Sequence, residues 1–253
     1  MTDDRPGMRV VATAGHVDHG KSTLLRALTG MEPDRWEEER RRGLTIDLGF
    51  VWTDLDTPAG PLTVAFVDVP GHERFVANML AGAGAAPLAL FVVAADDGWA
   101  AHSREHLDIL DLLGVPAAVV AITKLRIAGD ERAREVATDV GRRLAGTSLD
   151  GAPIMIVDGV SGEGVDGLRD QLSARLAATP DAPDRDRPRL WVDRAFTISG
   201  AGTVVTGTLA GGALQVGQEL ALLPLGRTTR IRGMQALGKP AERVDPGARV
   251  ALN

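Results

Sequence analysis

One stretch near the start of the chain has glycines, a lysine and a serine at a spacing suited to holding phosphate. Residues 15–22 read Gly-His-Val-Asp-His-Gly-Lys-Ser, between the apolar run 10–12 and the helical pattern 23–28. The glycines allow backbone turns that a Cβ would block, so consecutive N–H groups can face an anion. The start of the following helix adds unpaired N–H groups of its own. The pattern predicts a phosphate-binding loop between a strand and a helix.

Two side chains extend the chemistry of this loop beyond its backbone. Lys21 supplies a cation for the β- and γ-phosphates of a nucleotide, and Ser22 offers a hydroxyl to Mg2+. The other loop residues predicted to bind the nucleotide are Val17, Asp18, His19, Gly20 and Thr23. We expect His16 and His19 to shape the loop rather than to react. A glycine turn that binds nothing is disfavoured, because later segments supply other parts of the same site.

Those later segments could sense the terminal phosphate and position a water. Asp68 ends the apolar run 62–67, where it can hold Mg2+ through a water. Gly71 can bring its N–H against the γ-phosphate, and His72 can orient or polarise the attacking water. Thr45 lies on a loop from which its hydroxyl can reach the same ion, so two loops could form a phosphate-dependent switch. The predicted catalytic residue is His72, and the predicted metal ligands are Ser22, Thr45 and Asp68.

Strand and helix patterns alternate along the first part of the chain. Continuous apolar runs at 88–95 and 117–122 are typical of strands buried on both faces, whereas 130–144 and 165–176 keep helical spacing. The alternating apolar residues of 50–55 predict an edge strand. We therefore expect an α/β domain with a doubly wound, mostly parallel sheet, which binds its ligand at the carboxyl ends of the strands.

A change in composition predicts a second domain. Residues 178–188 contain three prolines and alternating charges, which is typical of an exposed linker. Short strands punctuated by glycines follow and predict a small antiparallel β-barrel. The expected organisation is a nucleotide-binding domain at 1–178, a linker at 179–188 and the β-barrel domain at 189–253.

The overall composition excludes several classes of protein. The chain of 253 residues has no cysteine, which rules out a disulfide framework and a cysteine-based zinc site. A net charge of -6 argues against a protein that coats nucleic acid non-specifically. The longest apolar run, 87–95, is too short to cross a bilayer, and the polar N-terminus lacks a leader pattern. We expect a cytoplasmic monomer that does not bind membranes.

These motifs, in this order, resemble those of the translational GTPases, the family of elongation and initiation factors. The resemblance is carried by 15–22, Thr45, 68–72 and 123–124, and it extends through the predicted barrel. It implies a GTPase that binds GTP and GDP with Mg2+ and acts on the ribosome. Segments 43–50, 75–82 and 192–202 are most similar to the branch that carries selenocysteinyl-tRNA.

In that branch the second domain holds the aminoacyl end of the tRNA, and the resemblance maps this pocket to Asp193, Arg194 and Arg232. An ionised selenol would favour fixed positive charge, and we expect Asp193 to orient one arginine. A surface ion pair on a barrel strand stays an alternative. The branch also has a further barrel and an RNA-binding extension. Because this chain ends at Asn253, it resembles a fragment or a shortened relative, and an mRNA hairpin would be read by domains absent from it.

The base-recognition motif departs from the family pattern of Asn/Thr-Lys-x-Asp. Here the segment is Thr123-Lys124-Leu125-Arg126, and arginine cannot accept the hydrogen bonds that guanine donates. On the other wall, Asp158-Gly159 replaces the family's Ser-Ala. The Gly159 N–H can still meet the base, and Asp158 can either pair with Arg126 or accept from the base. We predict intact phosphate binding with a weakened preference for guanine.

The preferred interpretation is a nucleotide-switched carrier of selenocysteinyl-tRNA that hydrolyses GTP on delivery to the ribosome. Two alternatives stay open: another, initiation-factor-like translational GTPase, and a degenerate nucleotide-binding module with relaxed base specificity. The presence of Thr45 and His72 disfavours the degenerate module. His102 and His106 carry no signal beyond a predicted helix surface.

Overall fold

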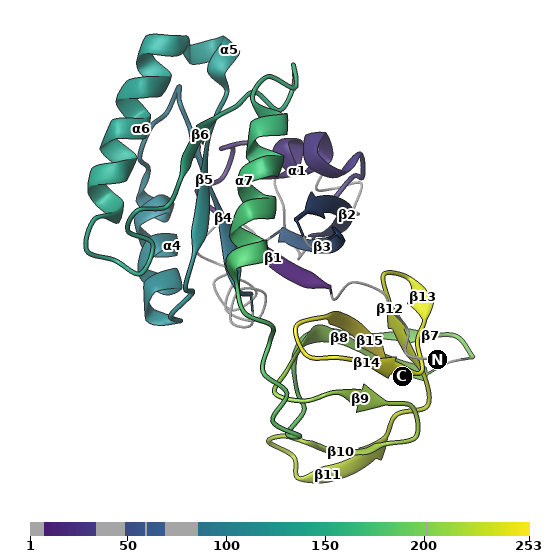
Figure 1. The fold of residues 1–253 in the computed structure, drawn as a ribbon. Coiled ribbons are helices and arrows are strands. Elements are labelled where there is room, and N and C mark those ends of the chain that lie inside the picture. Colours follow the sequence, from purple (N-terminus) through teal and green to yellow (C-terminus); the bar gives the residue numbers. More distant parts are fainter. Residues whose placement is uncertain (1–7, 34–48, 59, 69–85, 201) are drawn as a thin grey trace. The chain divides into compact units, whose positions relative to one another are not determined.

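The structure is a computed structural model that describes residues 8–33, 49–58, 60–68, 86–200 and 202–253. The chain divides into two compact units, 1–180 and 181–253, and each is described by itself (Figure 1). The predictions for Thr45, Gly71 and His72 lie outside the described residues.

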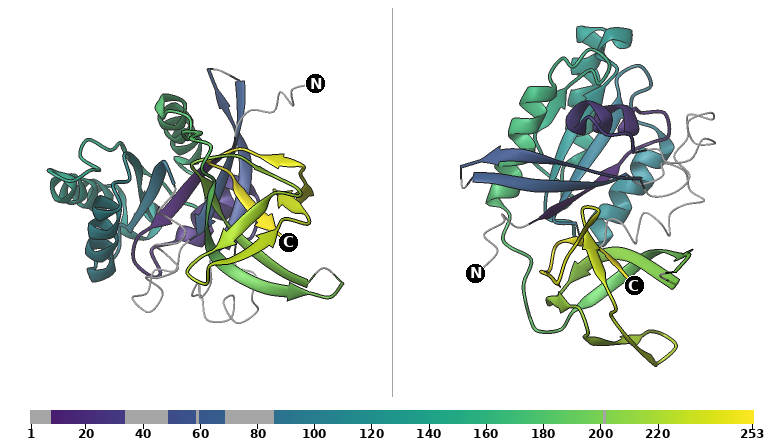
Figure 2. Two further views of the ribbon diagram at one scale, coloured as in Figure 1. Left: turned by 90° about the horizontal axis from the view of Figure 1, so that it is seen from below. Right: turned by 90° about the vertical axis from the view of Figure 1, so that its right-hand side faces the viewer.

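A six-stranded sheet forms the centre of the described part of the first unit, in the order β2-β3-β1-β4-β5-β6. Its strands are β1 (Arg9–Ala14), β2 (Gly49–Thr57), β3 (Gly60–Asp68), β4 (Leu88–Ala94), β5 (Ala118–Thr123) and β6 (Ile154–Ile156). Neighbouring strands are parallel except β2, which runs antiparallel to β3 at the edge. Figure 2 shows β2 and β3 as a long pair. The predicted edge strand and mostly parallel sheet are confirmed.

Helices cover both faces of this sheet. They are α1 (Lys21–Thr29), α4 (Ala101–Leu112), α5 (Leu125–Ala128), α6 (Asp130–Leu144) and α7 (Val165–Ala178) (Figure 1). Alternate residues of β4 enter different cores: Phe91 packs in the core with α4 and α6, whereas Leu90 packs in the core with α1 and α7. This burial on both faces explains why β4 is apolar throughout, since neither face of the strand meets water.

The topology brings the candidate residues to one edge of the sheet. The parallel strands β1, β3, β4, β5 and β6 all point the same way, so their carboxyl ends share an edge. The phosphate loop follows β1, and Asp68 is the last residue of β3. Thr123 ends β5, and Asp158 follows β6. The sheet therefore brings together loops that lie more than a hundred residues apart in the sequence. A hydrogen bond between Thr123, which ends β5, and His19, in the loop after β1, joins two of them.

The second unit is built from antiparallel strands, as predicted. Its larger sheet has the order β13-β12-β15-β8-β7, and two-stranded sheets are formed by β10 with β11 and by β14 with β9. The strands are β7 (Arg189–Ile198), β8 (Gly202–Ala210), β9 (Leu214–Gln215), β10 (Glu219–Leu222), β11 (Arg227–Arg230), β12 (Met234–Ala236), β13 (Lys239–Pro240), β14 (Arg243–Val244) and β15 (Arg249–Leu252). Strands β9, β12, β13 and β14 were not predicted, because two or three residues are too few to show a period.

Gly207 in β8 shows how closely β7 and β8 pack. A Cβ at this position would lie 2.2 Å from the carbonyl oxygen of Trp191, whereas a Cβ on Gly233 would meet nothing within 4 Å. We expect Gly207→Ala to destabilise the second unit by about 1–3 kcal/mol, because backbone must move. Gly233→Ala should change stability by less than about 0.5 kcal/mol. Calorimetric unfolding of both variants checks this, and equal shifts in Tm would contradict it.

Candidate functional site

The loop between β1 and α1 adopts the backbone that its glycines predict. Gly15 has φ 128°, and a Cβ there would lie 2.1 Å from the carbonyl oxygen of Val92. Gly20, immediately before α1, has φ 84°, and Asp18 is also left-handed at φ 61°. Left-handed residues interspersed in a turn allow successive N–H groups to converge on an anion. The loop therefore has a backbone suited to phosphate at the N-terminus of α1.

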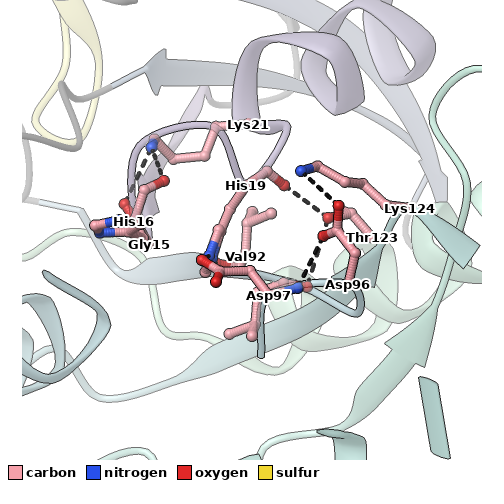
Figure 3. Close-up of polar contacts among 10 residues, drawn as sticks. Gly15, His16, His19, Lys21, Val92, Asp96, Asp97, Thr123 and Lys124 are labelled. Atoms are coloured by element: carbon pink, nitrogen blue, oxygen red, sulfur yellow. Dashed lines mark hydrogen bonds and ion pairs between the residues drawn. The ribbon is translucent and has the colours of Figure 1, made fainter. Parts of the chain in front are cut away.

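Lys21 folds back across this loop. Its Nζ donates to the carbonyl oxygens of Gly15 at 3.0 Å and of His16 at 2.8 Å (Figure 3). The side chain is buried. These bonds hold an ammonium charge at the loop, within reach of a phosphate oxygen that enters it.

Two of the three predicted metal ligands lie together. Ser22 Oγ donates to Oδ2 of Asp68 at 2.8 Å, and Thr13 Oγ1 donates to Oδ1 at 2.8 Å. Asp68 is fully buried, so the hydroxyls of Ser22 and Thr13 satisfy a carboxylate that water does not reach. Hydroxyl and carboxylate oxygens are the donors that Mg2+ prefers, and this pair fits such an ion. Sequence analysis missed Thr13.

His106 on α4 is not a surface residue, and that prediction is wrong. Its side chain is 2% exposed, and its Nδ1 accepts a hydrogen bond from the Gly15 N–H at 2.9 Å. Burial, and after it the charges of Lys21, His102 and His16, lower the pKa of His106 to about 3. The ring is therefore neutral at physiological pH and can accept. The burial of His106 could have been recognised from the sequence, because His106 lies at helical spacing from Ser103 and Leu110, which are also buried on α4.

His19 joins the loop to two neighbouring strands. Its carbonyl oxygen accepts from Thr123 Oγ1 at 2.6 Å, and its Nε2 lies 3.0 Å from Oδ2 of Asp97 (Figure 3). The side chain is 1% exposed, and burial lowers its pKa although Asp97 raises it. These contacts hold the loop against the ends of β4 and β5, which agrees with the expected shaping role of His19.

The segment that replaces the base-recognition motif begins a short helix, α5, which sequence analysis missed. Lys124 has φ 59° immediately before it, and its Nζ lies 3.1 Å from Oδ2 of Asp96. The Arg126 N–H donates to Oδ2 of Asp158 at 3.1 Å, and the Arg126 Nε lies 3.9 Å from the same oxygen. The Arg126 side chain is 61% exposed.

The Asp158 carboxylate already accepts hydrogen bonds from the backbone of its own loop. Its Oδ1 accepts from the N–H groups of Val160 at 3.0 Å and Ser161 at 2.9 Å. Burial raises the pKa of Asp158, but these bonds and that from Arg126 lower it more, so the net shift is downward. The contact of Asp158 with Arg126 is made mainly by the Arg126 backbone N–H, and the role of Asp158 toward a base stays a prediction. A Cβ on Gly159 would lie 3.3 Å from the Leu24 backbone, so this wall packs closely on α1.

In the second unit, Asp193 occupies a β-bulge and binds a residue that sequence analysis missed. The register of β7 shifts between Val192 and Arg194. The Asp193 carboxylate accepts from both Nη atoms of Arg249, with one contact at 2.9 Å, and from Thr206 Oγ1 at 2.8 Å. The Asp193 side chain is fully buried and that of Arg249 is 7% exposed. Asp193 is thus paired with Arg249 on β15, which lies outside the predicted pocket.

The other two residues of the predicted aminoacyl pocket lie on separate segments of this unit. Arg194 follows the bulge in β7 and is half-buried. Arg232 is exposed, and its backbone N–H donates to the carbonyl oxygen of Asn253 at 2.7 Å. A buried Asp193–Arg249 pair beside the bulge fixes the backbone from which Arg194 extends.

The fold and site together define a nucleotide-binding protein with a phosphate loop, because a Gly-rich turn, a lysine and a Ser–Asp pair meet at the sheet edge. Residues 7–178 match the family model of the elongation factor Tu GTP binding domain. The chain belongs to this family, the translational GTPases, which confirms the predicted resemblance. Among the described residues, no helix is long and apolar enough to cross a membrane.

Comparison with individual proteins points to one branch of the family. The chain is 46% identical over 246 residues to the selenocysteine-specific elongation factor of Desulfomicrobium baculatum, covering 96% of this chain and 38% of that protein. The crystal structure of a bacterial selenocysteine-specific elongation factor, EF-Sec, aligns with a TM-score of 0.90 at 34% identity, covering 98% of this chain and 42% of that one. The crystal structure of translation elongation factor SelB from Methanococcus maripaludis, in complex with the GTP analogue GppNHp, aligns with a TM-score of 0.85 at 31% identity. This alignment covers 98% of this chain and 52% of that one. The chain spans about two fifths of the length of the first relative it matches.

His106 predicts how stability responds to acid. Unfolded histidine binds a proton near pH 6.5, whereas the pKa of His106 in the folded chain is about 3. Between these values the unfolded state binds more protons, so the free energy of unfolding falls as the pH falls. From pH 7 to pH 5 this residue should remove about 2 kcal/mol.

The matched variant is His106→Asn, which keeps an acceptor but does not titrate. Its loss of stability over the same pH range should be smaller by about 2 kcal/mol. Calorimetric unfolding at pH 7, 6 and 5 measures both proteins. If wild type and variant lost the same free energy of unfolding between pH 7 and pH 5, protonation of His106 would not contribute to the loss.

Proposed function

We propose that this chain forms the nucleotide-binding and aminoacyl-binding parts of a GTP-switched carrier of selenocysteinyl-tRNA, which hydrolyses GTP when it delivers its cargo to the ribosome in the cytoplasm. The observation that carries the nucleotide-binding part is the meeting of Lys21, Ser22 and Asp68 at the phosphate loop. Similarity to selenocysteine-specific factors supports the choice of cargo. Recognition of an mRNA hairpin is assigned to no residue of this chain.

In the proposed site, the backbone of the loop and the side chains of Lys21 and Ser22 have separate tasks. The backbone N–H groups of 17–23 bind the α- and β-phosphates, and Lys21 turns to the β- and γ-phosphates. Ser22 and Thr45 would hold Mg2+ by their hydroxyls, with Asp68 acting through a water. When bound, this ion would neutralise charge between the phosphates.

The proposed hydrolysis step depends on two segments outside the described residues. The Gly71 N–H would contact the γ-phosphate, and His72 would orient the attacking water. Release of Thr45 and Gly71 after loss of the γ-phosphate would switch the protein between two states. We expect slow turnover by the isolated chain and faster turnover on the ribosome.

Base recognition is proposed to be weaker than the family pattern provides. Arg126 offers only donors, and Asp158 is occupied by backbone N–H groups. The N1–H and 2-amino group of guanine therefore lack the carboxylate that the usual aspartate supplies. This change affects the base and leaves the phosphate contacts as they are.

Restoring the carboxylate tests this part of the proposal. Arg126→Asp should raise the ratio of GTP to ATP affinity by about 10- to 100-fold, since hydrogen bonds to a charged group contribute about 1.5–3 kcal/mol. Arg126→Ala removes the cation without adding an acceptor and should change the ratio far less. Calorimetric titration with both nucleotides measures it. A wild-type preference for GTP that Arg126→Asp leaves unchanged would refute the weakened base site.

The choice of cargo is tested in the second unit. Arg194→Ala and Arg232→Ala should each reduce discrimination between selenocysteinyl-tRNA and seryl-tRNA, by about tenfold for loss of one charge-assisted contact. Arg230→Ala is the matched control, because Arg230 is exposed and pairs with Glu219 at 2.8 Å. Binding of both tRNAs is measured with GTP present. An unchanged ratio in both pocket variants would favour the initiation-factor-like alternative, a carrier of another tRNA.

A further inference from the structure

One hydrogen bond ties the phosphate loop to α4 and has no part in the nucleotide contacts described above. The Gly15 N–H donates to Nδ1 of His106 at 2.9 Å, across 91 residues of sequence. Both groups are buried. A backbone N–H that lies away from water needs an acceptor, so the position of His106 constrains the position of the Gly15 peptide.

Two further contacts restrain the Gly15 backbone. Its carbonyl oxygen accepts from Lys21 Nζ at 3.0 Å, and the approach of the Val92 carbonyl leaves no room for a Cβ. The conformation at φ 128° is one that glycine adopts readily and other residues rarely do. The two peptide groups that meet at Gly15 are therefore both held, one by His106 through the N–H and the other by Lys21 through the carbonyl oxygen.

The chemistry of the acceptor is specific. A histidine Nδ1 accepts only when it carries no proton. The charged and titratable groups that act on His106 are Lys21 from α1, His102 from α4 and His16 from the loop, and each disfavours protonation. Burial acts in the same direction and is the largest cause, and together these effects lower the pKa of His106 to about 3. The ring is thus kept as a neutral acceptor throughout the physiological range.

We propose that His106 is a positioning residue for nucleotide binding: its Nδ1 holds the Gly15 N–H and thereby keeps the phosphate loop in its receiving conformation with Lys21 in place. The inference rests on the proposed nucleotide-binding function. The inference adds a residue to the predicted site, because His106 lies outside the loop and makes none of the predicted contacts to phosphate, metal or base.

A matched pair of substitutions separates the acceptor from the volume of the side chain. His106→Asn can place Oδ1 near the position of Nδ1, whereas His106→Leu has a similar size and no acceptor. On the same helix, Ser103 is buried, and its hydroxyl has no hydrogen-bond partner among the described residues. Ser103→Ala therefore changes this face of α4 without touching the bond to Gly15.

The measurement is the dissociation constant for GDP with Mg2+, and for guanosine, by calorimetric titration of the full chain. We expect His106→Leu to weaken GDP binding about tenfold or more, as the loss of a buried hydrogen bond implies, with guanosine binding unchanged. His106→Asn should stay within about threefold of wild type, and Ser103→Ala should match wild type. If His106→Leu does not fold, His106→Gln replaces it, because its longer side chain moves the acceptor away from Gly15.

The outcomes distinguish this inference from the function on which it rests. Equal GDP affinity in wild type and His106→Leu, or equal weakening in the Asn and Leu variants, would overturn the positioning role. Equal loss of GDP and guanosine binding would indicate general destabilisation and would also overturn it. A wild-type chain that binds neither GDP nor GTP would refute the proposed function itself.

Discussion

The buried carboxylate of Asp68 is the group on which the arrangement of the site depends. It lies at the end of β3, and its two oxygens accept from Thr13 at the end of β1 and from Ser22 at the start of α1. A carboxylate withdrawn from water is tolerated only where hydrogen bonds or cations compensate for its lost hydration. The network therefore joins three elements at one point. Because the phosphate loop runs between Thr13 and Ser22, its two ends are fixed by the same residue.

A second set of contacts holds the loop to β4, β5 and α4. Val92 in β4 excludes any side chain at Gly15, and His106 of α4 accepts the Gly15 N–H. Thr123 in β5 binds the carbonyl of His19. The rings of His16 and His102 lie 4.4 Å apart, centroid to centroid. The loop is thus shaped before any ligand enters, which lowers the entropy lost when phosphate binds.

The sequence predicted those features that depend on local pattern or on a complete motif. The spacing of apolar residues gave α6 at its observed bounds, Asp130–Leu144, and the continuous apolar run gave β4. The roles of His106 and Arg249 were missed, because each depends on a partner far away in the chain: Gly15 for His106 and Asp193 for Arg249. Long-range pairing of this kind leaves no periodic signal. Helix α5 was missed because four residues are too few to show one. The roles of Thr45, Gly71 and His72 stay predictions.

We propose that the phosphates, rather than the base, provide most of the binding free energy at this site. Calorimetric titration of the full chain with GTP, GDP and guanosine, with and without Mg2+, measures this directly. We expect both nucleotides to bind at least about 100-fold more tightly than guanosine, and Mg2+ to strengthen GTP binding. Failure to take up GTP at millimolar concentration with Mg2+, or equal affinities for GTP and guanosine, would contradict it.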